Sequence, residues 1–243
     1  MAYLIEDPMD HTSRAFDVDL HGLERKILEM GRLVKQQIED ATGALLRRDV
    51  AFAEQVAAAD RQLDVLQHEI EGLAVTTIAR RQPVAVDLRE LIGAMRMVND
   101  LERIGDFAKN IAKRVAALID DFRINGVMPQ FELMTQQVVG QLTSVLESYE
   151  RRDVGKALQV WRKDQDIDAL NNSLFRTLLT HMMEHPRNIS SSIHLLFCAK
   201  NIERMGDHIT NIAEAIYYLV EGHEIEEERP KADTTSKDVL RSI

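Results

Sequence analysis

The chain repeats itself, and this repetition limits its fold more than any other feature. Residues 201–207 (Asn-Ile-Glu-Arg-Met-Gly-Asp) repeat residues 100–106 (Asp-Leu-Glu-Arg-Ile-Gly-Asp), and residues 151–154 repeat residues 47–50 (Arg-Arg-Asp-Val). A shift of 104 residues carries Ile27, Met30 and Val34 onto Phe131, Met134 and Val138, and towards the end of each half the shift is 101. Such self-similarity indicates that one structural unit was duplicated.

Each unit has the pattern of three long helices. Leu20, Leu23, Ile27, Met30 and Val34 recur at steps of three and four, which is the spacing of one apolar helix face. Equivalent stripes predict helices over about 18–48, 51–79 and 84–120, with the prolines falling between them. The sequence therefore predicts an all-α fold of two tandem three-helix bundles, six helices in all. We expect an N-terminal extension (1–17), a first repeat (18–125), a second repeat (126–223) and a charged C-terminal tail (224–243), with the extension and the tail mobile.

Charge and composition exclude several classes of function. A net charge of −10 disfavours binding to a nucleic-acid backbone. The single cysteine, Cys198, fits a reducing compartment. No apolar run is long enough for a membrane span, and the N-terminus does not read as a signal peptide. We therefore expect a cytoplasmic protein without nucleic-acid binding or membrane insertion.

Pairs of acidic residues spaced four apart are the main candidates for chemistry. Glu102 and Asp106 lie on one helix ridge that continues to Asn110, and this ridge faces away from the apolar stripe of that helix. Asp60 and Asp64 form a similar ridge on the preceding helix, so the two ridges can meet at the edge of the helix contact. In the second unit the equivalent residues are Asp164, Asp168, Glu203, Asp207 and Asn211.

Three readings of these ridges are open. Like charges four apart on a helix cost a few tenths of a kcal/mol per pair, which something should offset. Nearby cations could form salt bridges, a bound divalent or trivalent cation could bridge the carboxylates, or the ridges could be ordinary solvated faces. The candidate salt-bridge partners are Arg61, Arg103, Lys109 and Arg204.

Other candidate sites are weaker. His181 and His185 have metal-ligand spacing, but the first unit has no counterpart, and His208 stands where the first unit has Phe107. The chain lacks a phosphate-binding Gly-rich loop, a Gly-x-Ser-x-Gly elbow and any Glu-x-x-His pair of a di-iron bundle. The sequence therefore predicts no enzyme.

The combined motifs resemble the PhoU family of bacterial phosphate-signalling regulators. The resemblance rests on the two Glu-Arg-(Ile/Met)-Gly-Asp segments, on residues 83–89 (Pro-Val-Ala-Val-Asp-Leu-Arg), on the paired aspartates and on the two-times-three-helix layout. It runs from about Phe16 to Gly222. One departure is that the second unit has Pro-Arg-Asn-Ile-Ser-Ser-Ser at 186–192 in place of the Asp-Leu-Arg segment.

The resemblance implies a function and a set of ligands. It implies a non-catalytic, metal-binding adaptor that represses phosphate uptake and phosphate-starvation signalling, is cytoplasmic, and forms a homodimer. The implied partners are the ATPase subunit of the phosphate ABC transporter and the phosphate sensor histidine kinase. The implied metal is iron, manganese, magnesium, calcium or zinc, one cluster per repeat. The implied ligands are Asp60, Asp64, Glu102, Asp106, Asp164, Asp168, Glu203 and Asp207, with Asn110 and Asn211 as possible outer ligands. The alternatives are a carboxylate-metal hydrolase or oxidase, and a plain helical scaffold.

Overall fold

The computed structural model describes residues 8–118, 126–227 and 229, and in this part of the chain all regular structure is helical. The all-α prediction is confirmed, and so is the arrangement in two three-helix bundles. The first bundle comprises α1 (Pro8–Arg47), α2 (Val50–Ala59), α3 (Arg61–Arg81), α4 (Val86–Val115) and the 3₁₀ turn η1 (Ala116–Leu118). The second comprises α5 (Val127–Arg151), α6 (Val154–Arg162), α7 (Asp164–Glu184), the 3₁₀ turn η2 (Pro186–Asn188) and α8 (Ile189–Glu221).

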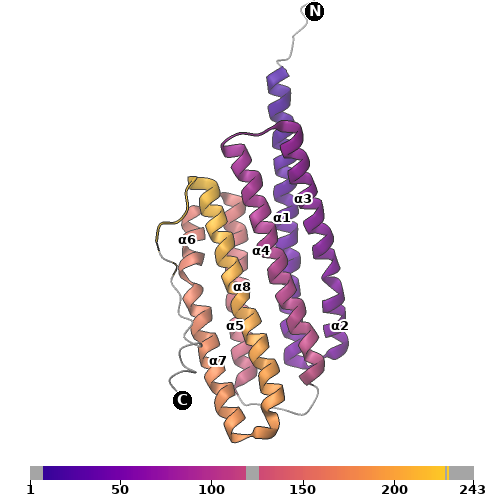
Figure 1. Cartoon of the computed structure of the whole chain (residues 1–243), viewed down its shortest axis with the longest axis vertical. Helices are drawn as coiled ribbons and strands as arrows, with labels where there is room; N and C mark the ends of the chain where they lie inside the picture. The colour runs from indigo at the N-terminus through magenta and orange to yellow at the C-terminus, as the bar shows by residue number, and fades with distance from the viewer. Residues whose placement is uncertain (1–7, 119–125, 228, 230–243) are drawn as a thin grey trace, which may run out of the picture.

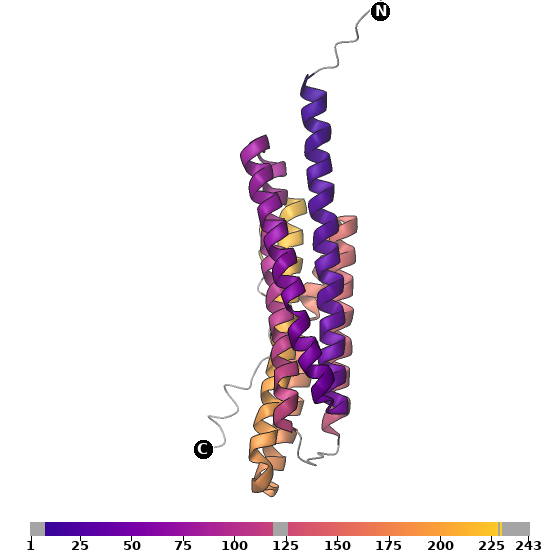
Figure 2. The ribbon, with the colours of Figure 1, turned by 90° about the vertical axis from the view of Figure 1, so that its right-hand side faces the viewer.

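The two bundles lie side by side and share one long contact surface (Figures 1 and 2). Helices α4 and α8 run antiparallel at the centre of one layer, with α2–α3 and α6–α7 on either side of them. Helices α1 and α5 form the layer behind (Figure 2). None of the described helices is long and apolar enough to cross a membrane.

The predicted apolar stripes form the core. Ile27, Met30 and Val34 are fully buried, and so are their repeats Phe131, Met134 and Val138. The core continues from one bundle into the other as a single cluster. At the contact between α1 and α5, a Cβ on Gly31 would lie 2.6 Å from both methyl carbons of Leu146, so glycine permits this close approach.

The second helix of each unit differs from the prediction. We expected one continuous helix over 51–79, but the helix bends at Asp60, and its counterpart bends at Lys163. Two buried glutamines 104 residues apart explain how these bends are supported. The Gln37 side chain donates to the Asp60 carboxylate at 3.0 Å, and the Gln141 side chain donates to the Lys163 carbonyl at 3.2 Å. These two hydrogen bonds hold the Asp60 carboxylate and the Lys163 carbonyl at the places where the helices change direction.

Both ends of the chain also differ from the prediction. The described part of helix α1 starts at Pro8, ten residues before the expected start, and proline is tolerated in a first helical turn because it has no N–H group to satisfy. After α8 the chain turns at Gly222 (φ 84°) and folds back, and Ile225 packs against the core. The start of the predicted mobile tail is therefore packed on the second bundle. Its remainder, residues 230–243, lies outside the described residues, so the mobility predicted there stays a prediction.

Candidate metal centre

The first acidic cluster forms where the α2–α3 bend faces α4. The bend turns Asp60 inward, and this residue is 4% exposed. Its carboxylate accepts hydrogen bonds from the Gln37 side chain and from the Lys109 ammonium. Lys109 also donates to Asp106 Oδ1 at 3.3 Å. One lysine thus joins carboxylates from two helices, as in the alternative that nearby basic residues form salt bridges with the acidic ridges.

The other two predicted carboxylates of this unit belong to the same cluster. Burial raises the pKa of Glu102, and the charges of Asp106 and Asp64 raise it further, while Arg103 lowers it. Arg103 is an exposed partner, 3.6 Å from Glu102 and 3.7 Å from Asp106. The structure therefore places Asp60 of one predicted ridge and Asp106 of the other on the same lysine, whereas Asp64 is exposed on α3.

Gly105 permits the close contact between these helices. A Cβ at this position would lie 2.5 Å from Leu63 Cδ1 and 3.1 Å from Gln37 Oε1. Glycine inside a helix costs about 1 kcal/mol relative to alanine. The space it provides lets α4 pack against the α2–α3 bend beside Asp60.

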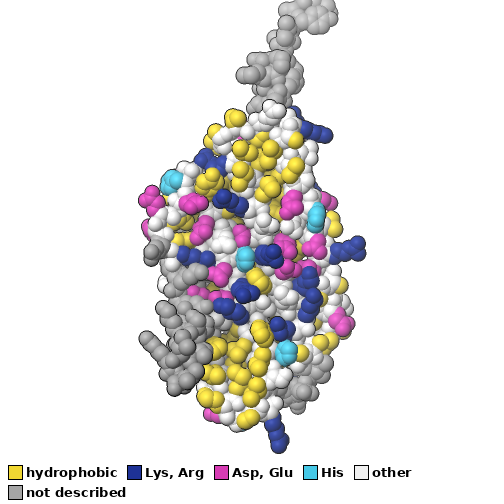
Figure 3. All heavy atoms as spheres, in the orientation of Figure 1, with side chains coloured by type: hydrophobic (Ala, Val, Ile, Leu, Met, Phe, Trp, Pro, Cys, Tyr) yellow, Lys and Arg dark blue, Asp and Glu magenta, His cyan; other side chains and the backbone are white. Residues whose placement is uncertain are grey.

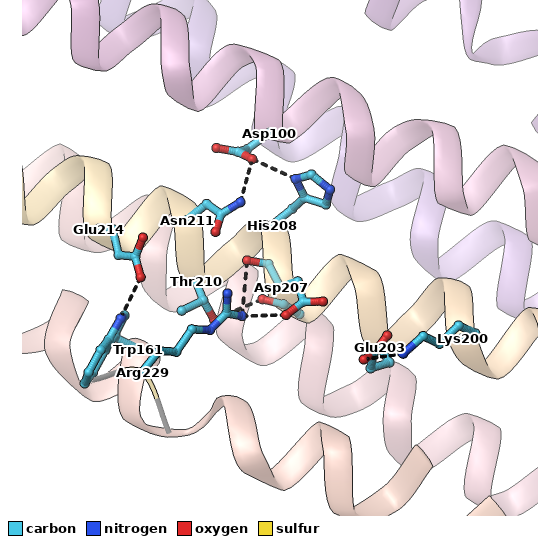
Figure 4. Close-up of polar contacts among 11 residues, drawn as sticks. Asp100, Trp161, Lys200, Glu203, Asp207, His208, Thr210, Asn211, Glu214 and Arg229 are labelled. Atoms are coloured by element: carbon cyan, nitrogen blue, oxygen red, sulfur yellow. Dashed lines mark hydrogen bonds and ion pairs between the residues drawn. The ribbon is translucent and has the colours of Figure 1, made fainter. Parts of the chain in front are cut away.

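The second cluster repeats the acidic residues, but its carboxylates pair with basic side chains from other positions (Figure 4). Glu203 is 5% exposed and accepts from Lys200 at 2.7 Å, and Asp207 forms a 2.7 Å ion pair with Arg229. Burial raises the pKa of Glu203, Lys200 lowers it, and the charges of Asp207 and Asp168 raise it. Glu203, Asp207 and Asp168 therefore share one electrostatic environment. The side chain of Asp164 lies outside the described part of the structure.

The clusters differ because the basic residues of the two repeats stand at different positions: Lys200 replaces Asn99, and Lys109 has no basic counterpart. Thr210 stands at the position of Lys109, and its hydroxyl donates to the Gly206 carbonyl within its own helix. Arg229, from the segment after α8, supplies a positive charge instead. This segment also closes a pocket of about 480 Å³ between the units, beside the 2.9 Å hydrogen bond from Trp161 Nε1 to Glu214. The role of Arg229 could not be predicted from the sequence, because the segment that carries it has no helical periodicity.

The two predicted outer ligands lie differently. Asn110 is exposed, whereas Asn211 points across to the other bundle and donates to Asp100 Oδ1 at 3.2 Å. His208 Nδ1 lies 2.7 Å from the same oxygen (Figure 4). The His208 ring is 5.5 Å from Phe107, its equivalent in the first unit, so the repeats meet through matching residues. Asn211 therefore takes part in a hydrogen bond between the two bundles.

The histidine pair is separate from both clusters. The rings of His181 and His185 lie 4.6 Å apart at the end of α7. Burial lowers the pKa of His181, and the neighbouring His185 lowers it further.

The donor atoms of the clusters suit a hard cation, although basic side chains now occupy the same places. Buried oxygens without a hydrogen-bond partner remain on Gln37 (Oε1), Gln141 (Oε1) and Glu203 (Oε2). Carboxylate and amide oxygens are the ligands that magnesium, calcium and manganese prefer. Within the described residues, no three carboxylate, imidazole or thiolate groups are arranged to hold a metal ion. A cation would therefore have to displace Lys109 or Lys200. Gln37 and Gln141 were not among the predicted ligands, and the 104-residue spacing that relates them is the signal that could have found them.

One known family of protein domains matches both repeats of this chain. The family model described as the PhoU domain matches twice, over residues 27–115 and 131–216. The chain belongs to the PhoU family. The resemblance predicted from the motifs is thereby confirmed. The two matched segments fall one in each bundle, while the exact domain boundaries stay a prediction.

Several PhoU relatives match along nearly their whole length. The phosphate-specific transport system accessory protein PhoU homolog of Rhizobium meliloti is 48% identical over 93% of this chain and 95% of that protein. The homolog of Caulobacter vibrioides is 42% identical over 94% of this chain and 99% of that protein. The crystal structure of PhoU from Pseudomonas aeruginosa covers 86% of this chain and all of its own, with 36% identity and a TM-score of 0.82. The phosphate transport system regulatory protein PhoU from Streptococcus pneumoniae reaches a TM-score of 0.81 at 29% identity, covering 87% of this chain and all of its own.

Proposed function

We propose that this chain is an accessory protein of a phosphate-specific transport system, and that it represses phosphate uptake and starvation signalling without catalysis. The names of its relatives support the accessory role, since they match over more than nine-tenths of this chain. The regulatory role is supported by the name of the Streptococcus pneumoniae structure, a transport system regulatory protein. We place the protein in the cytoplasm, where it would contact the transporter ATPase subunit and the sensor histidine kinase, as a homodimer.

The observation that carries the cation-binding part is the repeated convergence of carboxylates. In the first unit Asp60, Asp64, Glu102 and Asp106 share one environment, with Gln37 beside them. We propose that these side chains hold a divalent or trivalent cation, and that Asp164, Asp168, Glu203 and Asp207 do so in the second unit. The bound cation would neutralise the carboxylates and cross-link two helices.

Binding of a cation would also change what the basic side chains do. Lys109 now joins Asp60 to Asp106, and Lys200 holds Glu203. A cation that takes the carboxylate oxygens releases these ammonium groups towards solvent. The charge pattern of the surface would then depend on metal occupancy, and this is how the clusters would influence what a partner protein contacts.

Co-purification from phosphate-replete cells tests this function. We expect wild-type protein to recover the transporter ATPase subunit and the sensor kinase. The variant with Glu102→Gln, Asp106→Asn, Glu203→Gln and Asp207→Asn should recover less of both, because neutral side chains bind cations weakly. A Lys26→Met variant, which breaks only a surface ion pair with Glu69, is the control. Recovery of neither partner by wild type would contradict the adaptor role, and equal recovery by all variants would contradict the role of cations.

A further inference from the structure

The second bundle carries an apolar groove between α7 and α8, away from both the core and the inter-bundle pocket. The groove has a volume of about 260 Å³ and is lined by Asn171, Phe175, Ile193, Leu196, Phe197 and Lys200. In Figure 3 hydrophobic side chains gather over the lower ends of these two helices. Exposed apolar groups collected in this way are typical of interaction sites, since single exposed residues are common but patches are not.

The exposed residues form two parallel rows. On α8, Ile189, Ile193 and Phe197 are spaced four apart and are 41%, 40% and 51% exposed. On α7, Leu179 and Met183 continue the row that begins at Phe175. Rows at this spacing on two adjacent helices form the surface into which the apolar face of a third helix packs.

The first unit serves as an internal comparison, because it has the same fold and another surface here. Glu71 stands at the position of Phe175, and Arg96 stands at the position of Phe197. The repeats thus place charged groups in one unit where the other has aromatic rings. Packing inside a bundle does not explain the rings, since the same fold accepts charges at both places.

The surroundings of the groove are basic, although the chain as a whole has a net charge of −10. Between residues 169 and 202 Glu184 is the only acidic residue of the sequence, against three basic residues, Arg176, Arg187 and Lys200, of which Lys200 is ion-paired with Glu203 just beyond this stretch. From the neighbouring bundle, the guanidinium of Arg114 lies 4.3 Å from the centre of the Phe197 ring. The equivalent stretch of the first unit, 65–101, holds five acidic residues (Glu69, Glu71, Asp87, Glu90 and Asp100) against four basic ones (Arg80, Arg81, Arg89 and Arg96), so its balance is acidic where that of the second unit is basic.

We propose that the α7–α8 groove binds an amphipathic helix of a partner protein, with bulky apolar side chains on one face and acidic residues flanking that face. The apolar face would pack between Phe175 and Phe197, and the acidic flanks would meet Arg114, Arg176 and Arg187. This inference rests on the proposed adaptor function, since it supplies the docking surface that an adaptor needs. It does not require that either acidic cluster binds a cation.

Two synthetic peptides test the proposal on the full chain. Both are helical peptides of about 18 residues, or five turns, with leucine and phenylalanine along one face. One carries glutamate on both flanks of that face, and the other carries lysine at the same places. Fluorescence anisotropy of labelled peptides measures binding to wild type and to Phe175→Glu, Phe197→Arg and Val75→Glu. The first two install the side chains of the first unit, which the fold tolerates there, and Val75 is the exposed counterpart of Leu179.

We expect saturable binding of the acidic peptide, weakened about tenfold or more by Phe175→Glu and by Phe197→Arg but unchanged by Val75→Glu. The lysine peptide should bind far less. The proposal is overturned if the acidic peptide does not bind, if both peptides bind equally, or if Val75→Glu weakens binding as much as the groove variants. Two other occupants would also overturn the proposal if peptide binding is absent. Loss of dimerisation by the groove variants in sedimentation would show that a second copy of the chain fills the groove. Loss of binding to phosphatidylglycerol vesicles would show that a membrane surface does. Partner recovery from cells can fail while the peptide still binds, so the two proposals fail separately.

Discussion

Lys109 should be the most important cation of the first cluster, and Lys109→Met tests this. The substitution keeps most of the apolar stem, but among the described residues it leaves Asp60, whose side chain is 5% exposed, with only its Gln37 bond. Breaking a buried ion pair by removing one partner costs about 3–5 kcal/mol. Because the Lys109 side chain is itself 27% exposed, we expect a loss nearer 2–4 kcal/mol in the free energy of unfolding. In a chain of this size that corresponds to a lowering of the melting temperature on the order of 10 °C.

Thermal unfolding of metal-free protein, with and without Mn²⁺, measures the effect. Lys26→Met is the matched control, because its partner Glu69 is 52% exposed and a surface pair of this kind contributes at most about 1 kcal/mol. A cation at 100 times its dissociation constant stabilises a protein by about 2.7 kcal/mol. Mn²⁺ should therefore raise the melting temperature of Lys109→Met more than that of wild type, where the lysine competes. A Lys109→Met variant that is no less stable than Lys26→Met, or equal stabilisation of all three proteins by Mn²⁺, would rule out this role of Lys109.

Three further predictions concern packing, pH and reactivity. Gly105→Ala should lower the free energy of unfolding by about 1–2 kcal/mol, because the added methyl group overlaps Leu63. Gly72→Ala has open space around it and should raise the free energy of unfolding by up to about 1 kcal/mol. Urea titrations measure both changes, and changes of the same sign would contradict the close approach at Gly105. Burial raises the pKa of Glu203 above its ordinary value, so its ionisation destabilises the fold as the pH rises. The stability of Glu203→Gln relative to wild type should therefore increase as the pH rises above about 4.5, and a constant difference would refute this. Burial raises the pKa of the Cys198 thiol to about 12, so a thiol reagent should modify Cys198 at neutral pH only at the rate at which the protein opens, and immediate labelling would contradict its burial.

The fold could be predicted from the sequence because the apolar residues that form the core recur at the spacing of a helix face. The stripe through Ile27 and Val34 fixes the buried face of α1, and its repeat through Phe131 and Val138 fixes that of α5. Duplication then requires two copies of one bundle. The bends at Asp60 and Lys163 were missed because no proline or glycine marks them. They depend on hydrogen bonds from α1 and α5, which helical periodicity does not reveal.

The candidate site was predictable in its acidic half and much less so in its basic half. Spacing placed Glu102 and Asp106 on a ridge facing Asp60 and Asp64, and it left salt bridging to Lys109 open as one alternative. Lys200 and Arg229 were not anticipated. Arg229 reaches its carboxylate through a turn after α8 and not through helical spacing.

We propose that the paired acidic ridges capture cations. Crystals of the metal-free protein soaked with Mn²⁺ would reveal such binding through anomalous scattering near the manganese absorption edge. We expect one anomalous peak or cluster beside Asp60 and Glu102 and another beside Asp168 and Glu203, with the ammonium groups of Lys109 and Lys200 moved away from the carboxylates. Absence of anomalous signal at both places, with the two lysines still bonded to their carboxylates, would contradict the claim.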